Sequence, residues 1–271
     1  MLSRTKALKI SLPLLAVLIV SASLVTILRP YVQYEGIYED ASAWGSFFNV
    51  FGVIYAIVAG FLLITVLNRY SSLSQTIEDE LNAVESVRDF LVYFETGQHD
   101  ALQDMRASLL RYIRTVATTE WQEMADPSTP TNSDTSEELY EIMRCTGRFH
   151  VTEERDSSVL SAVISSVSDL AKLRTRRIAL ANERLPHRLR ILLFFMSVSL
   201  GAAFLVVGIR SLFAHIFMTS TLSLSVYLLY WIIEDLDHPF YGVWNIDRTP
   251  MDELIKRFEL EISSVSTDDT Q

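Results

Sequence analysis

The chain has 271 residues, of which 49% are hydrophobic, and its 23 Lys and Arg against 33 Asp and Glu give a net charge of −10. A mean hydropathy of +0.24 is too apolar for a soluble chain with this many charges unless the apolar residues are clustered. They are clustered, in four long runs that contain almost no charge, which excludes a simple globular enzyme. The acidic balance, with no basic phosphate-binding face, argues against a nucleic-acid partner.

The four apolar runs lie at residues 7–28, 47–67, 191–209 and 212–233. Each has roughly 20 residues, which lets a helix cross the hydrocarbon core of a lipid bilayer. The sequence therefore predicts an all-α integral membrane fold with four transmembrane helices. For the first run, a cleaved signal peptide with small residues at Ser21-Ala22-Ser23 is the alternative, but the apolar stretch continues to Leu28, which favours a retained span.

Lysine and arginine gather at particular ends of these runs, and this bias sets the expected orientation. They lie before or at the start of the first run and flank the long middle segment on both sides, at Arg4, Lys6, Lys9, Arg69, Arg184, Arg188 and Arg190. We therefore expect a multi-pass protein of the cell membrane with both termini and the middle segment in the cytoplasm. The single cysteine, Cys145, cannot form an internal disulfide and fits a domain in a reducing compartment.

The expected organisation has four parts. Residues 1–68 hold the amino-terminal segment and the first transmembrane pair, 69–190 a cytoplasmic helical domain, 191–233 the second pair, and 234–271 a cytoplasmic tail. Within 69–190, apolar residues recur at spacings of three and four. This pattern predicts a helical bundle with helices at about 71–91, with Ser71 or Ser74 as the amino-terminal cap, and at about 100–121, 136–148 and 152–186. A loop is expected at 126–134.

Acidic residues follow the fourth run, in Glu234-Asp235-Leu236-Asp237 and then His238-Pro239-Phe240-Tyr241-Gly242. Carboxylates at the carboxy-terminal end of a helix are electrostatically unfavourable, so a compensating partner is expected. The partner is either a cation or an arginine of the cytoplasmic helices, for which Arg174, Arg176 and Arg177 are the candidates. A solvated helix end closed by Pro239 and a Gly242 turn is the simpler alternative.

Catalytic motifs are missing from the sequence. It has no glycine-rich phosphate loop, no zinc-binding pair of histidines or cysteines at ligand spacing and no nucleophile elbow. We therefore expect no enzymatic activity and no resident cofactor.

Several short motifs come in an order that resembles a known family. They are Phe51-Gly52-Val53-Ile54-Tyr55-Ala56 in the second run, Glu120-Trp121 at the end of a cytoplasmic helix, Leu185-Pro186 before the third run, and Asp237-His238-Pro239-Phe240-x-Gly242 after the fourth. Together with the order of the spans, they resemble the bestrophin-like proteins, a broad and mostly prokaryotic group of membrane proteins distantly related to the bestrophin anion channels.

The resemblance implies a homo-oligomer, a pentamer in bestrophins proper, with the second span around a central pore that passes inorganic ions, anions by preference. It also implies that the Pro-Phe-x-Gly segment wraps the cytoplasmic domain close to where animal bestrophins bind calcium, which makes Asp237 and Asp247 candidate metal ligands. The chain departs from the family pattern in two ways. The dense acidic run after Pro-Phe-Gly is missing, which counts against calcium gating, and the proline of the pore neck is absent from the second span.

A helical wheel sorts the second run by side-chain size. Small residues at Gly52, Ala56 and Gly60 fall on one face and would let another helix approach closely. Bulky residues fall on nearly the opposite face, at Phe47, Phe51, Ile54, Val58, Phe61 and Thr65. That bulky stripe meets either lipid or, if the resemblance holds, a pore that closes by dewetting.

Three functions therefore stay open from the sequence. The resemblance favours an ion channel, and the main rival is a non-conducting membrane scaffold or signalling protein whose cytoplasmic bundle binds a protein partner. A transporter would need internal repeats or broken helices, and neither is clear in this sequence. His215, the one ionisable residue of the fourth run besides its tyrosines, is expected to be an interhelical contact rather than a proton relay.

Overall fold

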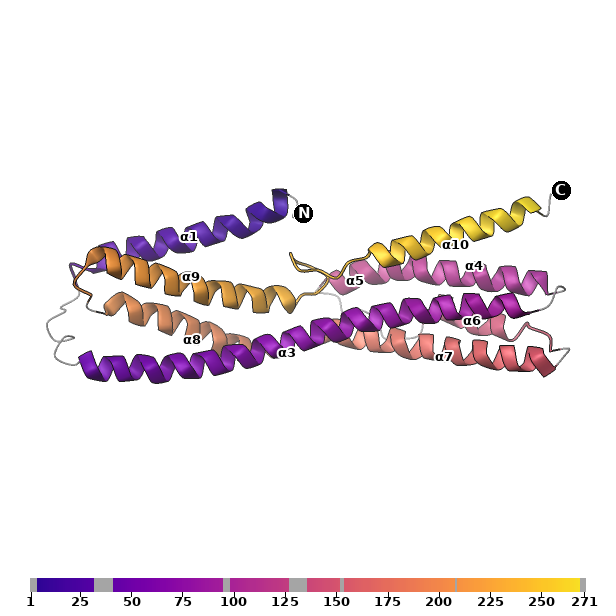
Figure 1. Cartoon of the computed structure of the whole chain (residues 1–271), viewed down its shortest axis with the longest axis horizontal. Coiled ribbons are helices and arrows are strands. Elements are labelled where there is room, and N and C mark those ends of the chain that lie inside the picture. The colour runs from indigo at the N-terminus through magenta and orange to yellow at the C-terminus, as the bar shows by residue number, and fades with distance from the viewer. Residues whose placement is uncertain are drawn as a thin grey trace. The chain divides into compact units, whose positions relative to one another are not determined.

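The computed structural model describes residues 4–31, 41–94, 98–126, 136–151, 154–207 and 209–268, and all regular secondary structure in these ranges is helical (Figure 1). The helices are α1 (Arg4–Leu28), α3 (Ala41–Phe90), η1 (Leu91–Tyr93), α4 (His99–Thr115), η2 (Val116–Glu120), α5 (Trp121–Ala125), α6 (Glu137–Thr146), α7 (Glu154–Asn182), α8 (His187–Val206), α9 (Leu212–Leu236) and α10 (Thr249–Asp268). The segment η1 is a short 3-10 helix and η2 is π-helical.

The chain divides into two compact units. We call Met1–Asn68 with Arg184–Asp237 the span unit, and Arg69–Glu183 with His238–Gln271 the bundle unit. Four helical stretches contain a window long and apolar enough to cross a membrane: Ser11–Leu28, Ser42–Tyr93, Glu154–Val206 and Leu212–Leu236. The four spans expected from the apolar runs are therefore present as helices.

In the span unit, α1 packs along α9, and α8 packs against both (Figure 1). Ser21 of α1 donates a hydrogen bond to Ser220 of α9 across 3.0 Å, and Val25 is buried one turn further along α1. Small polar side chains that bond between apolar helices are typical of membrane helix packing.

Helix α3 corrects the expected helix boundaries. The sequence predicted a span ending at residue 67 and a new helix capped by Ser71 or Ser74, but α3 runs without a break through 50 residues from Ala41 to Phe90. No glycine or proline follows Gly60 within α3, so nothing in the sequence stops the helix between the apolar and the polar part. The cap prediction at these serines was wrong.

The bundle unit has a continuous apolar core. The buried side chains that α3, α4, α6, α7 and α10 contribute to it include Leu73, Val84, Val87, Met105, Leu109, Ile113, Leu139, Ile142, Val163, Leu170, Leu254 and Phe258. In α3, α4 and α7 they lie at the spacings of three and four seen in the sequence, which confirms the predicted apolar faces of these three helices. The predicted loop at 126–134, apart from Asp126, and the predicted helix start near Thr152 lie outside the described residues.

Helix α10 was missed because the carboxy-terminal segment was taken as a tail. Asp247 Oδ1 accepts hydrogen bonds from the Thr249 amide (3.0 Å) and hydroxyl (2.7 Å), and Pro250 stands in the first turn, where its lack of an amide hydrogen costs nothing. Met251, Leu254 and Phe258 are buried, and the helix lies along α4 (Figure 1). Their spacing of three and four was the available signal.

Phe258 anchors α10 and gives a test of this packing. The side chain has no exposed surface, and the Arg88 guanidinium lies 5.6 Å from the centre of its ring. We expect Phe258→Ala to lower the free energy of unfolding of the bundle by about 3–5 kcal/mol, because it leaves a cavity in the core. Chemical denaturation in detergent measures the loss. Leu260→Ala is the matched control on the same helix, since Leu260 is 70% exposed, and equal losses in both variants would contradict the packing.

Candidate functional site

The bulky stripe predicted for the second span lies on the amino-terminal half of α3, and the chain's own helices leave it largely uncovered. Phe47 is 51%, Ile54 48% and Phe61 65% exposed, Thr65 is exposed, and Phe51 and Val58 are half-buried. In the described part of α3, residues 42–68 carry no charged side chain. A largely uncharged apolar face is thus available for lipid, for another subunit or for a pore.

The small-residue stripe is also open within the chain. A Cβ atom added at Gly52 or Gly60 would meet no described atom within 4 Å, and Ala56 between them is exposed. The face of α3 that the span unit does bury is a different one, formed by Tyr55, Ala59, Leu62 and Val66. At 100° per residue, this buried face lies between the small and the bulky stripe, so both stripes stay largely open within one chain.

An aromatic cluster stands at the start of α3. Phe47 stacks on Phe51 with ring centres 5.6 Å apart, and Phe48 lies 5.7 Å from Phe47 and 5.9 Å from Trp44. Phe48 also contacts Phe204 of α8, at 5.3 Å. These contacts join the first residues of the bulky stripe to the end of α8 inside the span unit.

Asp237 closes the end of α9 with a set of short hydrogen bonds. Its side chain is completely buried; Oδ1 accepts from the Leu185 amide (2.9 Å) and Oδ2 from Arg190 (2.7 Å), while its backbone carbonyl accepts from Arg184 (2.8 Å). Arg190 Nε also lies 2.8 Å from Glu234. The compensating partner is therefore an arginine, as one of the sequence interpretations held. It is Arg190 rather than one from the cluster at 174–177, because the Leu185-Pro186 turn brings the start of α8 to the end of α9.

The rest of the post-span motif belongs to the bundle unit. The Tyr241 amide donates to the His238 carbonyl (3.0 Å), and the Ile246 amide to the Pro239 carbonyl (2.9 Å). Phe240 is buried with its ring edge-on to Trp121 at 5.0 Å. Gly242 has a φ of 148°, which side chains other than glycine rarely adopt, so this turn depends on the glycine.

The metal-ligand assignment of Asp237 and Asp247 stays a prediction, and the structure gives both carboxylates other roles. Asp237 uses both oxygens for protein donors, and Asp247 caps α10, where hydrogen bonds from Thr249 hold its pKa below the ordinary value. Calcium at either position would have to share or displace these donors. Within the described ranges, no group of three or more His, Cys, Asp or Glu side chains is arranged to hold a metal ion.

Two carboxylates and two arginines meet inside the bundle unit, where all four residues are buried. Arg177 of α7 donates to Glu80 of α3 (Nε to Oε2, 2.6 Å) and to Glu120 of η2 (Nη2 to Oε2, 2.5 Å), and its own exposure is 0%. Arg174 donates to Glu120 through Nη2 (2.7 Å), and the Tyr112 hydroxyl to Glu80 (2.5 Å). We call these five residues the charge cluster.

The charge cluster is electrically balanced and tightly bonded. Burial by itself raises the pKa of Glu120, but the charges and hydrogen bonds of Arg177 and Arg174 outweigh it, so that pKa lies below its ordinary value. The stability that ionised Glu120 contributes is complete above its unfolded pKa of about 4.3 and is lost as the pH falls through the lower folded value. Burial and the Glu80 charge raise the pKa of Tyr112 well above its ordinary value, so the phenol keeps its proton and donates it.

Sequence reasoning missed the charge cluster. It placed Glu120 in a motif and Arg174 and Arg177 in a basic group, but assigned the arginines to Glu234, Asp235 or Asp237. The paired arginines and glutamates lie 54 to 97 residues apart in the chain, and no local pattern links them.

The π-helical segment η2 ends in Glu120, and Arg248 donates to the Ala117 carbonyl in it (3.0 Å). π-Helical segments are frequent at functional sites, but they leave no signal in composition.

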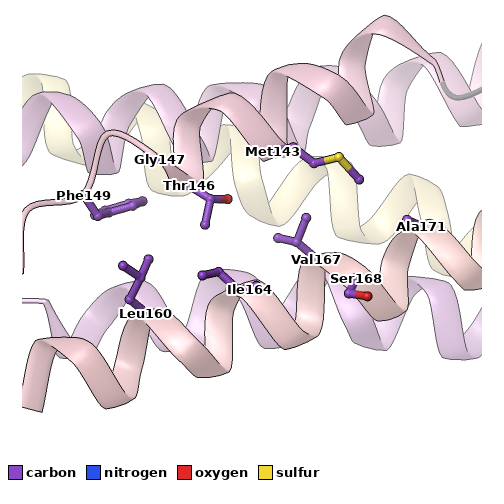
Figure 2. A pocket seen from close by; sticks show the side chains of 9 residues that line it. All are labelled: Met143, Thr146, Gly147, Phe149, Leu160, Ile164, Val167, Ser168 and Ala171. Atoms are coloured by element: carbon purple, nitrogen blue, oxygen red, sulfur yellow. The ribbon is translucent and has the colours of Figure 1, made fainter.

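An apolar cavity of about 460 Å³ lies in the bundle unit between α6 and α7. Side chains of the two helices point into it from both sides (Figure 2), and the lining consists of Met143, Thr146, Gly147, Phe149, Leu160, Ile164, Val167, Ser168 and Ala171. Met143 and Ile164 are 39% and 53% exposed, so the cavity opens to the surface of the chain.

Arg177→Met tests how much the bundle depends on the charge cluster. It leaves Glu80 and Glu120 buried with too few cationic partners, and we expect the free energy of unfolding to fall by about 3–5 kcal/mol. Arg176→Met is the control, because Arg176 is the exposed neighbour and should change stability by less than about 0.5 kcal/mol. Denaturation curves of the two variants that coincide would refute a structural role of the cluster.

Comparison with known proteins identifies the family and the fold of this chain. A family model described as a Bestrophin-like domain matches residues 15–251, and no curated protein matches the chain. A single-substitution variant of a bacterial bestrophin homologue from Klebsiella pneumoniae aligns with a TM-score of 0.72 at 16% identity, over 93% of this chain and 99% of that one. Another crystal structure of the Klebsiella homologue gives 0.67 at 15% identity, over 92% and 98%.

A crystal structure described as that of a membrane protein gives a TM-score of 0.69 at 16% identity, over 95% of this chain and 97% of that one. At such low identities, these matches establish the fold. The family model covers most of the sequence, from residue 15 within the first span to residue 251 beyond the Asp237–Gly242 turn. The chain belongs to the bestrophin-like family.

Proposed function

We propose that this protein is a homo-oligomeric ion channel in which α3 of each copy lines a central pore. The observation that carries the proposal is the bulky stripe of α3, which is largely apolar, about half-exposed and mostly uncovered by the chain's own helices. Family membership supports the same assignment, since the homologue from Klebsiella is a bestrophin homologue of the same fold. A stripe of Phe, Ile and Val around a pore would form a constriction that closes by dewetting.

The orientation follows from the charges at the helix ends. Arg69 follows the apolar part of α3, and Arg184, Arg188 and Arg190 precede or begin the apolar part of α8. By the positive-inside rule, these ends face the cytoplasm, together with the bundle unit and both termini. The turn between α8 and α9 then lies on the opposite side of the membrane.

The small stripe gives each copy a place to pack on the next. Gly52, Ala56 and Gly60 leave space at which the helix of a second copy can approach closely. A closed ring built through this repeated contact is consistent with the pentamer that the resemblance implies.

Anions are the preferred ions in this proposal. The stripe has no Lys or Arg, so a basic ring does not provide the preference. Phenylalanine rings carry a partial positive charge at their edges, and Phe47, Phe51 and Phe61 can present these edges to an ion in the constriction. This favours weakly hydrated anions over cations.

A non-conducting scaffold is the second candidate function. The observation that favours it is the open apolar cavity between α6 and α7, which could hold an apolar side chain of a protein partner. In that case α3 would face lipid and other subunits, and substitutions in the stripe would alter only stability. Flux measurements separate the two functions.

Phe51→Ala tests the channel directly. The oligomer is purified in mild detergent, its mass is measured, and chloride and potassium fluxes are recorded after reconstitution into liposomes. We expect wild-type chloride flux and a higher flux in Phe51→Ala, because a smaller apolar side chain widens the constriction and makes it easier to wet. Phe217→Ala is the control, since Phe217 is 61% exposed on α9 and outside the stripe.

Two results would count against the channel. One is a well-folded oligomer that passes neither ion over a range of pH and calcium concentrations. The other is an equal effect of Phe51→Ala and Phe217→Ala on flux. Either result would direct attention to the cavity of the bundle unit and to a protein partner.

A further inference from the structure

His215 of α9 is completely buried in the span unit, where α9 packs against α1 and α8. It is the only titratable side chain in residues 11–28 of α1, 191–206 of α8 and 212–226 of α9. A buried ionisable group in an apolar helix bundle is costly to keep, which makes it a candidate for a role in function.

The geometry fixes how His215 is bonded. Its Nε2 lies 3.1 Å from the backbone carbonyl of Phe204, and because a carbonyl can only accept, Nε2 carries the hydrogen. Phe204 stands in the last turn of α8, where carbonyl groups lack an amide partner in their own helix. His215 therefore caps the end of α8 from the neighbouring helix.

The other ring nitrogen has no partner among the described residues. Nδ1 of His215 is buried and makes no hydrogen bond, and the same holds for the hydroxyl of Thr219, one helical turn further along α9. In the neutral ring, Nδ1 is an acceptor without a donor. A proton on Nδ1 makes it a donor, and the Thr219 hydroxyl is an acceptor on the same face of the helix.

Few charges face this site from the packed helices. Arg29 at the end of α1 donates to the Arg210 carbonyl in the α8–α9 connection (2.6 Å), and these two cations oppose a charge on His215. The carboxy-terminal end of α8 favours a positive charge on His215, because that end of a helix carries a partial negative charge. The remaining charged or titratable groups of these helices stand at the ends of α1 or toward the other end of α8 and α9, at Arg4, Lys6, Lys9, Tyr31, His187, Arg188, Arg190, Tyr227, Tyr230, Glu234 and Asp235. On α3, which also packs on α8, the Tyr55 hydroxyl accepts a hydrogen bond from Ser197 of α8 (3.4 Å).

A continuous set of contacts leads from His215 to the bulky stripe of α3. The residue whose carbonyl it binds, Phe204, packs its ring on Phe48 at 5.3 Å. Phe48 lies against Phe47 at 5.7 Å, and Phe47 stacks on Phe51 at 5.6 Å. A change in how the last turn of α8 is held therefore acts on the aromatic cluster through packed side chains within one compact unit.

We propose that His215 is a proton-binding positioning residue, and that its protonation at Nδ1 changes how the end of α8 supports the aromatic cluster and so regulates the pore. This inference rests on the proposed channel function. In the orientation proposed above, the site lies near the side of the membrane opposite the bundle, so the protein would respond to pH on that side.

His215→Gln is the decisive variant, because glutamine keeps an N–H donor for the Phe204 carbonyl but takes up no proton in this range. Chloride flux into liposomes is measured between pH 5 and 8, where histidine changes its charge. We expect wild-type flux to change about 5-fold or more over this range and the flux of His215→Gln to stay constant. His187→Gln, which replaces an exposed histidine of the same unit, should keep the wild-type profile. A pH profile that persists in His215→Gln overturns the inference.

A second readout separates this inference from the channel proposal. Nitrogen NMR of the labelled imidazole ring reports whether Nδ1 of His215 takes up a proton between pH 5 and 8, whether or not ions pass. A ring that stays neutral over the whole range overturns the inference even in a conducting protein. A ring that titrates in a protein without flux supports the proton site and contradicts the channel.

Discussion

A guanidinium group without access to water must be surrounded by carboxylates, and Arg177 is such a group. Its bonds to Glu80 and Glu120 hold α7 against α3 and against the π-helical segment η2, while Arg174 and Tyr112 satisfy the remaining carboxylate oxygens. Breaking one of these bonds leaves a buried charge unpaired, which costs about as much as deleting a large apolar side chain from the core. The charge cluster therefore links α7 to α3 and η2, and α4 to α3, and the apolar core packs around it.

A similar rule applies in the span unit, where few polar groups are available and several of them bond to a specific partner. Asp237 receives the Leu185 amide and Arg190, Ser21 bonds to Ser220, and His215 caps the last turn of α8. These bonds hold α1, α8 and α9 together. By contrast, the bulky and small stripes of α3 stay largely uncovered within one chain. This exposure is the physical basis for proposing that α3 makes contacts outside the chain, with the pore on one side and a neighbouring copy on the other.

The sequence predicted what is decided locally. Apolar runs gave the four spans, and spacings of three and four gave the buried faces of the bundle helices. Partners distant in the chain could not be predicted, so Arg177 was assigned to the wrong carboxylates and Arg190 was not recognised as the partner of Asp237. The unbroken helix through Ser71 and Ser74 was missed because serines suggested a cap, although no helix-breaking residue stands there. Helix α10 was missed despite the spacing of Met251, Leu254 and Phe258.

The central claim is that the bulky stripe of α3 lines an aqueous pore, and cysteine accessibility tests it most directly. Single cysteines are placed in a Cys145→Ala background, in which the chain's only natural cysteine, a buried one, is absent. The stripe positions are Phe47, Phe51, Ile54, Val58, Phe61 and Thr65, and the control positions are Ile57 and Ile64, which are 66% and 59% exposed on another face. A charged, membrane-impermeant thiol reagent should block chloride flux from the stripe positions and leave the two controls unaffected. The claim would be contradicted if the reagent blocked flux through the variants with cysteine at position 57 or 64, or if it blocked none of the stripe variants.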